Sequence, residues 1–479
     1  MTSSGQPAPS YEELAALVVE QAATITRLRA ELARANERIS ELETRLARSS
    51  RNSSQPPSSD AFVKPAPKSQ RRRTGRKPGG QDGHQGRTRA QTPDPDHVVK
   101  HEPSMCGGCG ADLGRAERTG LVRRQVVDLP PITPTVTEHH MIERTCACGK
   151  ATRARAPKGV NAPVRFGANV RAVICYLYLG QFLSAKRTAQ ALSDLVGCTV
   201  SAGTVVATAH RAATALEAFT TCAAQRIAAA EVAHFDETSL RVAGSLAWVH
   251  SASTGKYSLL TVHPRRGTEA MDAAGVLPAF AGLAVHDAWA PYDTYTGVAG
   301  HVLCNAHLLR ELQAVQDAAG EGAWCWAGQA AEALRQMKAL VDAHLAKAAS
   351  LEGVDTGRLG ALRHCWRSAV LLGLAQTSGR ESKLVAKFHA LARRMRDRQA
   401  DYLRFTVDAR APFDNNAAER EVRMVKVRQK VSGCLRSLAG AGWFCAVRSY
   451  IATAAKNGIA MFDALVRLAE GECWMPEMA

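Results

Sequence analysis

Three acidic residues far apart in the sequence stand where a carboxylate can be aimed at a partner. Asp236 follows an apolar run in the stretch HFDETSL, and Asp287 ends a second such run in GLAVHDAWAPY. Both runs are typical of β-strands. Glu419 lies about one turn inside a helix predicted by DNNAAEREVRMVKVRQK, whose Asp414 to Asn416 form the capping segment.

The elements around the first two acids indicate how they could meet. Residues 231–242 read as a strand, and two further strands follow, joined at Ser253–Gly255. Then come a helix, the strand that ends at Asp287, a short strand and another helix. This succession of strands and helices predicts a mixed sheet covered by helices. The first and fourth strands can be neighbours in it, so Asp236 and Asp287 are expected to face each other.

Facing carboxylates repel each other, and a divalent cation can neutralise them. With Glu419 as a third ligand, the site could hold two Mg²⁺ ions about 4 Å apart. Such a pair activates a water or a 3′-hydroxyl and stabilises the leaving oxygen of an in-line phosphoryl transfer. Each acid also has an ordinary explanation: Asp236 as a turn cap, Asp287 as a loop residue, and Glu419 as a salt-bridge partner within its helix.

Basic residues are unevenly placed and favour a polyanionic partner. The formal net charge is +17 and the pI is about 9.5, which points to nucleic acid. Residues 49–104 form a linker poor in apolar side chains, which is either a DNA-binding arm or only a solvated tether. The residues that could neutralise phosphates are Arg71, Arg72, Arg73, Arg76 and Lys77 in this linker, and Arg420, Arg423, Lys426, Arg428 and Lys430 after the third acid.

Four cysteines form two Gly-flanked pairs. Cys106 and Cys109 lie in CGGCG, and Cys146 and Cys148 lie in CACG. Residues 122–144 between them alternate like strands around a Pro-Pro turn. Thiolates in this pattern predict a tetrahedral zinc site, with the neighbouring histidines as possible substitute ligands. The alternative is four free cysteines.

The remaining segments read as helices. Residues 11–48 carry a heptad seam that a single helix cannot bury, which predicts a coiled coil, or else a helix packed on its own protein. Within 165–228, a helix over 185–195, a Gly-containing turn and a second helix capped by Ser201 outline a helix-turn-helix, although two packed helices with a Gly turn are common. Trp324 and Trp326 belong to a helical insertion and are expected in its core rather than stacked on DNA.

Other features concern location. The 46% hydrophobic content is that of a globular protein, and no run of 18 apolar residues predicts a membrane span. The N-terminal stretch lacks the regions of a signal peptide. The thirteen cysteines are consistent with a reducing compartment. We therefore expect a cytoplasmic, nucleoid-associated bacterial protein.

Ordered along the chain, SSRNSSQPPSSD, GRKPGGQDGHQGRTR, HFDETSL, HDAWAPY, CNAHLLREL and DNNAAEREVRMVKVRQKVSGC resemble the large catalytic subunit of insertion-sequence-66 family transposases. The resemblance covers nearly the whole chain. It implies a DDE-type enzyme with an RNase H-like core and two-metal catalysis, in which Asp236, Asp287 and Glu419 are the triad. The residues that match other parts of the family pattern are Cys304, His307, Asn415, Asn416 and Arg420. The second cysteine pair departs from it, being C-x-C where C-x2-C is usual.

The expected protein is an α+β multidomain transposase that binds element ends, nicks them and joins them to target DNA, with Mg²⁺ or Mn²⁺ and Zn²⁺ as cofactors. Its partners would be double-stranded DNA, further copies of the chain and accessory proteins of the same element. The alternatives are an inert DNA-binding regulator derived from a transposase and a nuclease that does not join strands. The expected segments are a coiled coil (1–48), a basic linker (49–104), a zinc-binding β module (105–150), a helical DNA-binding region (151–228), an RNase H-like core in two parts (229–319 and 405–479) and a helical insertion (320–404).

Overall fold

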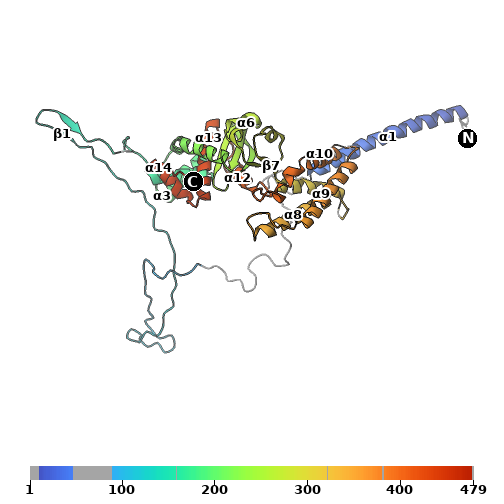
Figure 1. The fold of residues 1–479 in the computed structure, drawn as a ribbon. Coiled ribbons are helices and arrows are strands. Elements are labelled where there is room, and N and C mark those ends of the chain that lie inside the picture. The colour runs from blue at the N-terminus through green and yellow to red at the C-terminus, as the bar shows by residue number, and fades with distance from the viewer. Residues whose placement is uncertain (1–9, 47–88, 158, 321, 380–381, 477–479) are drawn as a thin grey trace, which may run out of the picture.

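The computed structural model describes residues 10–46, 89–157, 159–320, 322–379 and 382–476, which form a mixed α/β protein (Figure 1). Among these residues, no helix is both long and apolar enough to cross a membrane. The elements in chain order are α1 (Tyr11–Leu46), β1 (Glu143–Thr145), β2 (Ala151–Arg153), α2 (Ala168–Cys175), η2 (Tyr176–Gly180), α3 (Ala185–Val196), α4 (Ala202–Thr214), α5 (Glu217–Ala228), β3 (Val232–Val242), β4 (Ser245–Ser253), β5 (Ser258–His263), α6 (Thr268–Ala273), η3 (Leu277–Ala279), β6 (Leu283–His286), η4 (Ala290–Thr294), β7 (Gly300–Leu303), α7 (Asn305–Ala319), α8 (Trp326–Leu345), α9 (Thr356–Gln376), α10 (Lys383–Asp397), α11 (Gln399–Tyr402), η5 (Arg404–Thr406), α12 (Asn416–Ser432), α13 (Leu438–Lys456) and α14 (Met461–Glu470).

The N-terminal segment is a single helix, α1, of 36 residues. Its seam side chains are open to solvent, since Leu28 is 54% exposed and Leu32 is 62% exposed. An apolar stripe that the chain leaves uncovered is what a coiled-coil partner would bury, so self-association through α1 stays a prediction. The basic cluster from Arg71 to Lys77 lies outside the described residues.

The segment that carries the four cysteines contains less sheet than the alternation predicted. Within residues 122–144, only the last two belong to a strand, in the hairpin that β1 forms with β2. The expected strands around Pro130 and Pro131 are therefore wrong. Val126 is 93% exposed and Val136 is 90% exposed, so the apolar side chains that alternate here find no surface to cover. Proline also lacks the N–H group that a ladder requires.

The second sheet has the strand order β5-β4-β3-β6-β7. Strands β3, β4 and β5 are antiparallel neighbours, whereas β3, β6 and β7 run parallel. The mixed sheet and the adjacency of its first and fourth strands agree with the sequence. Alternate residues of β6 pack on opposite faces: Leu283 and Val285 contact the cluster of α7 and α8, and Ala284 contacts the cluster of Phe235 and Phe280.

Helices pack against this sheet. Helix α12 packs on β3 and β4, and α13 packs on β5 and on α4. Helices α3 and α4 form the predicted helix pair, because Gly197 ends α3 with φ 64° and the Ser201 hydroxyl caps α4 by accepting from the Thr204 N–H. The pair is therefore confirmed, and its reading of DNA stays a prediction.

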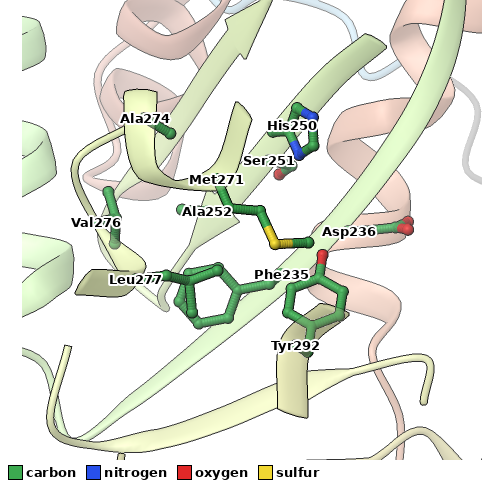
Figure 2. A pocket seen from close by; sticks show the side chains of 10 residues that line it. All are labelled: Phe235, Asp236, His250, Ser251, Ala252, Met271, Ala274, Val276, Leu277 and Tyr292. Carbon is green, nitrogen blue, oxygen red and sulfur yellow. The ribbon is translucent and has the colours of Figure 1, made fainter. Parts of the chain in front are cut away.

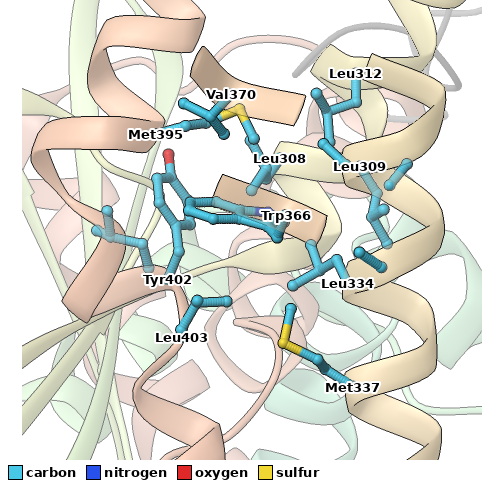
Figure 3. Packing of buried hydrophobic residues seen from close by; sticks show 14 of the residues in the cluster. Leu308, Leu309, Leu312, Leu334, Met337, Trp366, Val370, Met395, Tyr402 and Leu403 are labelled. Carbon is cyan, nitrogen blue, oxygen red and sulfur yellow. The ribbon is translucent and has the colours of Figure 1, made fainter. Parts of the chain in front are cut away.

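The insertion is a helical unit built around Trp366. Helices α8, α9 and α10 pack together at one end of the sheet in Figure 1, and Figure 3 shows Trp366 between Tyr402, Leu308 and Leu334. Trp366 is fully buried. Trp326 is 2% exposed, as expected of a core residue, whereas Trp324 is 62% exposed and the expectation for it was wrong. Trp324 precedes α8 and so lies outside the packed helix faces.

Two glycines of α9 give opposite predictions. A Cβ atom at Gly373 would lie 2.6 Å from the Trp326 ring, whereas nothing lies within 4 Å of one at Gly360. Gly373→Ala should destabilise the protein by about 1–3 kcal/mol because the core is overpacked. Gly360→Ala, the matched control, should stabilise it by roughly 0.5–1 kcal/mol through helix propensity. Urea unfolding curves measure both, and equal effects would contradict the packing of α9 on α8.

Candidate functional site

The first two acids lie at equivalent places just beyond the ladder that joins two parallel strands, Asp236 within β3 and Asp287 directly after β6. The ladder pairs His234 of β3 with Val285 of β6, an offset of 51 residues (285 − 234). Asp236 and Asp287 have the same offset (287 − 236), so each comes two residues beyond the last paired position. Because side chains repeat every two residues along a strand, both carboxylates continue the same row. The fold therefore brings together two acids from distant parts of the sequence.

The third acid is positioned by the start of α12. Asn415 precedes this helix and is fully buried. Its Nδ2 atom donates to the carbonyl of Phe235 at 2.7 Å, and its Oδ1 atom lies 3.0 Å from Nδ1 of His234. Its backbone N–H donates to Sγ of Cys304 at 3.2 Å. One amide side chain thus ties the first turn of α12, which carries Glu419, to the strand that carries Asp236.

The three carboxylates act on one another electrostatically. Burial is the main cause that raises the pKa of Asp236 well above its usual value, and the nearby carboxylates raise it further. Those carboxylates are Glu237, Asp287 and Glu419. Burial also raises the pKa of Asp287, although the N–H of Trp289 donates to its Oδ1 atom at 3.1 Å. The ionised forms of both aspartates are therefore costly without a cation.

Glu419 turns toward α7 and not toward Arg423, which is exposed on α12. Its Oε1 atom lies 3.4 Å from Nη2 of Arg310 and 3.4 Å from Nδ1 of His307. Burial lowers the pKa of His307 to about 3, so this imidazole is neutral and the contact is not an ion pair. The ordinary explanation of Glu419, a salt bridge within its own helix, is thus replaced by a contact across two helices. Arg310 had no signal in the sequence.

A fourth acid, Glu237, is held by partners that the sequence did not reveal. Its Oε1 atom accepts from Nε of Arg266 at 3.0 Å, and its Oε2 atom accepts from the Tyr292 hydroxyl at 2.7 Å. The Arg266 guanidinium also lies over the rings of Trp289, at 3.9 Å, and Trp248, at 4.8 Å. Glu237 therefore neutralises and orients an arginine beside the site, and it is less free than Asp236 to bind a ligand.

An apolar wall backs the site. A small cavity of about 20 Å³ lies beside β3. Figure 2 shows the side chains that line it, such as Phe235, Met271 and Leu277. Asp236 lies at its edge and points away from these apolar groups. The cavity is too small for a substrate. This wall keeps water away from one side of the carboxylates, which strengthens the electrostatic interactions among them.

The donor set of the three acids suits hard divalent cations, which prefer carboxylate oxygens. Their oxygens do not all lie within 4.8 Å of one another in the part of the chain that the structure describes. Two ions about 4 Å apart do not require the three carboxylates to lie so close together. A carboxylate that binds one of the ions at ~2.1 Å does not have to reach the other ion. Such ions would neutralise the negative charge around the buried Asp236, whose pKa is raised by burial and by its acidic neighbours.

Two other groups of potential ligands occur among the described residues. Sγ of Cys304 and Nδ1 or Nε2 of His307 lie within 4.8 Å of a Glu419 oxygen, but they are softer donors than Mg²⁺ prefers. His286, Asp293 and His301 form the second group. There the carboxylate of Asp293 is already paired with Nη1 of Arg398 at 2.6 Å, so a cation would compete with an arginine.

The zinc candidates form two separate turns. Gly110 N–H donates to the Cys106 carbonyl at 2.9 Å, and Gly149 N–H donates to the Cys146 carbonyl at 2.8 Å, with φ of 73° and 83° at the two glycines. Each turn holds its two thiols on one side of a tight loop. In the region described, Cys106, Cys109, Cys146 and Cys148 do not gather three sulfurs within 4.8 Å. Binding of one zinc ion by all four cysteines stays a prediction.

The basic residues after Glu419 divide between surface and interior. Arg420 and Arg423 are exposed. Nζ of Lys426 donates to the carbonyl and hydroxyl oxygens of Ser239, and Arg428 is 5% exposed. The helix thus separates them as its periodicity predicted.

Comparison with known proteins gives a family for most of the chain. Residues 163–442 match the family described as Transposase IS66 family, and residues 103–149 match the zinc-finger binding domain of transposase IS66. Residues 6–90 match a family of unknown function, DUF6444. No curated protein matches the chain. The first match spans the five-stranded sheet, helix α12 and the three carboxylates described above.

Removing the charge of Asp236 should stabilise the protein when divalent cations are absent. A carboxyl group whose pKa is raised on folding costs stability at pH above its unfolded value, and the cost disappears as pH falls below that value. We expect Asp236→Asn to raise Tm by about 3 °C at pH 8 in a chelator, which is roughly 1 kcal/mol, and to have no effect near pH 3.

Asp408→Asn is the matched control for this measurement. Hydrogen bonding to Arg410 lowers the pKa of Asp408, so its removal should leave Tm unchanged or lower it. Differential scanning fluorimetry across pH measures both variants. A fall in Tm with Asp236→Asn would show that the carboxylates do not repel one another.

Asn415 should matter far more than its neighbour. Asn415→Ala removes the bonds to Phe235 and His234, and leaves buried polar groups unpaired, at a cost of about 2 kcal/mol. Asn416 is exposed, and Asn416→Ala should change stability by less than ~0.5 kcal/mol. Chemical denaturation gives both values. Similar costs for the two variants would rule out the bridging role of Asn415.

Proposed function

The chain belongs to the IS66 family of transposases, and on that premise we propose that it cuts the ends of a DNA element and joins them to target DNA in one carboxylate site. The observation that carries this proposal is the common register of Asp236 and Asp287 on neighbouring strands, with Glu419 approaching from α12. Buried acids collected in this way from three elements, with the pKa values of Asp236 and Asp287 raised, fit phosphoryl transfer better than a structural role.

The catalytic domain in this proposal is an RNase H-like core. Support comes from the sheet order β5-β4-β3-β6-β7, in which three antiparallel strands precede two parallel ones, with a helix before and after the last strand. The helical insertion α8–α10 interrupts that core between β7 and α12. The core therefore consists of residues 229–319 together with 405–479.

Asp236, Asp287 and Glu419 would hold the metal ions, through oxygen donors that suit Mg²⁺ or Mn²⁺. When bound, these cations supply activation of the nucleophile and stabilisation of the leaving oxygen. The first reaction hydrolyses a phosphodiester bond at the element end and leaves a 3′-hydroxyl. The second uses that hydroxyl oxygen to attack a phosphodiester of target DNA, which is a transesterification.

The other side chains orient this site. Asn415 fixes α12 against β3, so Glu419 keeps its place relative to Asp236. The Arg310 guanidinium, 3.4 Å from the Glu419 carboxylate, holds that side chain on the α7 side until a cation competes for it. Glu237 and the Trp289 ring hold the Arg266 guanidinium near Asp287, where its remaining N–H groups can meet a DNA phosphate.

The remaining segments would bring DNA and protein copies together. The zinc-finger domain, with Cys106, Cys109, Cys146 and Cys148 as ligands, and the helix pair α3–α4 would bind the element ends. The arginines Arg71–Arg73, Arg76, Arg420 and Arg423 and the Lys77 ammonium would contact phosphates without reading sequence. The exposed seam of α1 would join copies of the chain, so that two ends can be held at once.

Substituting each acid tests the chemistry. We expect Asp236→Asn, Asp287→Asn and Glu419→Gln to reduce end cleavage and strand transfer by about 10²-fold or more, with DNA binding retained. Glu421→Gln is the control, because this neighbouring acid bonds to Ser258 and Lys456 and is not part of the trio. Labelled element ends, target plasmid and Mg²⁺ provide the assay.

The outcomes of that assay separate the possible functions. Cleavage without joining by the unaltered protein indicates a nuclease. DNA binding without either reaction indicates a regulator. Cleavage that survives all three substitutions would place the active site elsewhere.

Loss of one cysteine ligand should separate DNA binding from chemistry. Cys106→Ser should lower the bound zinc, measured by mass spectrometry of the metal content, and weaken binding to element ends by about tenfold, with residual cleavage of DNA. Cys365→Ser, at an exposed cysteine of α9, is the control. Full zinc content in Cys106→Ser would exclude this cysteine as a ligand.

A further inference from the structure

A groove of about 760 Å³ separates the helix pair from the end of α12. Helices α3 and α4 contribute Lys186, Gly203 and His210, and α12 and the loop after it contribute Arg428 and Arg436. Of the described residues that line it, none is acidic. The groove therefore has a positive lining, which is complementary to an anion.

Three helices begin at this groove. Ser184, Ser201 and Ser437 cap α3, α4 and α13, and each hydroxyl accepts only the N–H of the third helical residue. The first N–H groups of a helix have no acceptor inside it, and they carry the positive end of the helix dipole. Residues of all three first turns line the groove. These N–H groups are suited to phosphate oxygens.

Arg428 adds an independent indication of an anion. It lines the groove but is only 5% exposed. Its Nη1 atom donates to the Gly433 carbonyl at 3.0 Å and its side chain also forms a hydrogen bond with Tyr178, but no carboxylate in the described part of the chain forms an ion pair with it. A buried arginine without a counter-charge is costly to hold. A phosphate in the groove would neutralise it.

An aromatic pair lies along the same groove. The rings of His210 and Trp443 stack at 4.6 Å with an angle of 26°, and both residues belong to the lining. Aromatic side chains beside a positive channel are the arrangement that binds unpaired bases and their backbone.

We propose that this groove binds the sugar–phosphate backbone of a single DNA strand at the element end, an inference that rests on the transposase function proposed above. Its volume is that of pockets enclosing ligands of roughly 300–1,000 Å³. It is too small to enclose a duplex, whose major groove alone is about 12 Å wide.

The groove has a fixed relation to the carboxylates. The loop after α12 pairs with the end of β3, because Ala243 N–H donates to the Leu435 carbonyl at 2.7 Å and Leu435 N–H donates to the Arg241 carbonyl at 3.1 Å. Along α12, Arg428 comes nine residues after Glu419 (428 − 419). That is about 14 Å of helix, or roughly four nucleotides at 3.4 Å each. The bound strand would thus be gripped a few nucleotides from the bond that is cut.

Alkylation of Cys434 tests the occupant directly. This exposed thiol lines the groove, whereas Cys365 is exposed on α9. With the full-length protein, iodoacetamide and no added divalent cation, a short oligothymidylate should slow modification of Cys434 by about fivefold or more and leave Cys365 unchanged. Equal rates with and without the oligonucleotide would overturn the proposal, as would protection by blunt duplex alone. A Cys434 that resists alkylation before DNA is added would show another part of the chain in the groove, and would also overturn it.

Neutral substitutions test the charges. Lys186→Gln with Arg436→Gln should weaken oligothymidylate binding by about tenfold at low salt. It should also reduce the slope of log K against log salt by about 1.4, which is 0.7 for each lost phosphate contact. Arg187→Gln with Lys256→Gln removes two exposed cations outside the lining, and should change neither. An unchanged slope in the first pair would overturn the proposal.

These tests measure DNA binding and do not depend on DNA cleavage or strand transfer. If the oligonucleotide protects Cys434 but the protein never cuts DNA, the result supports the groove and contradicts the proposed activity. Cutting and joining by a protein whose Cys434 is not protected overturns the groove alone.

Discussion

The repulsion among the carboxylates gathered where the ladder between β3 and β6 ends is the constraint on which the rest of the structure depends. Asp236 and Asp287 meet because two parallel strands share one register. Their ionised forms cost free energy in a site backed by apolar side chains. The surrounding core must supply that free energy. It does so through apolar clusters on both faces of the sheet, where Phe235 and Val285 are almost completely buried.

A long insertion can stand between α7 and α12 because both of its ends are fixed at one place. At the start of α7, the Asn305 N–H donates to the Phe413 carbonyl at 3.1 Å, and the Asn305 Nδ2 atom donates to the Tyr402 carbonyl at 2.9 Å. The point where the chain leaves the core after β7 and the point where it returns before α12 are therefore joined by hydrogen bonds. Asn415 follows at once and fixes α12 on β3. The insertion packs around Trp366, and its apolar core is continuous with that of β6, β7 and α7.

Helix α12 connects the chemistry to the proposed strand groove. Its first turn holds Glu419 at the carboxylates, and the turn before its last carries the buried Arg428. A helix has a fixed rise for each residue, so the distance between these two places cannot vary much while α12 stays intact. In the proposed function, a DNA strand held at one end of α12 is presented to the acids at a set distance. Positioning of this kind supplies much of the catalysis of phosphoryl transfer.

The sequence by itself determined the local elements: the strand of Asp236, the turn at Ser253–Gly255 and the cap at Ser201 came from alternation, glycine and hydroxyl signals that act within a few residues. It also gave the three acids as candidates, which the geometry supports and no comparison tests. Alternation misled at residues 122–144, because a strand needs a partner surface that the local pattern does not contain. Only the tertiary structure decided that Glu419 contacts Arg310, that Tyr292 holds Glu237 and that Asn415 bridges α12 to β3. These contacts join residues 55 to 180 positions apart, and nothing in a short stretch of sequence specifies which distant partner it will meet.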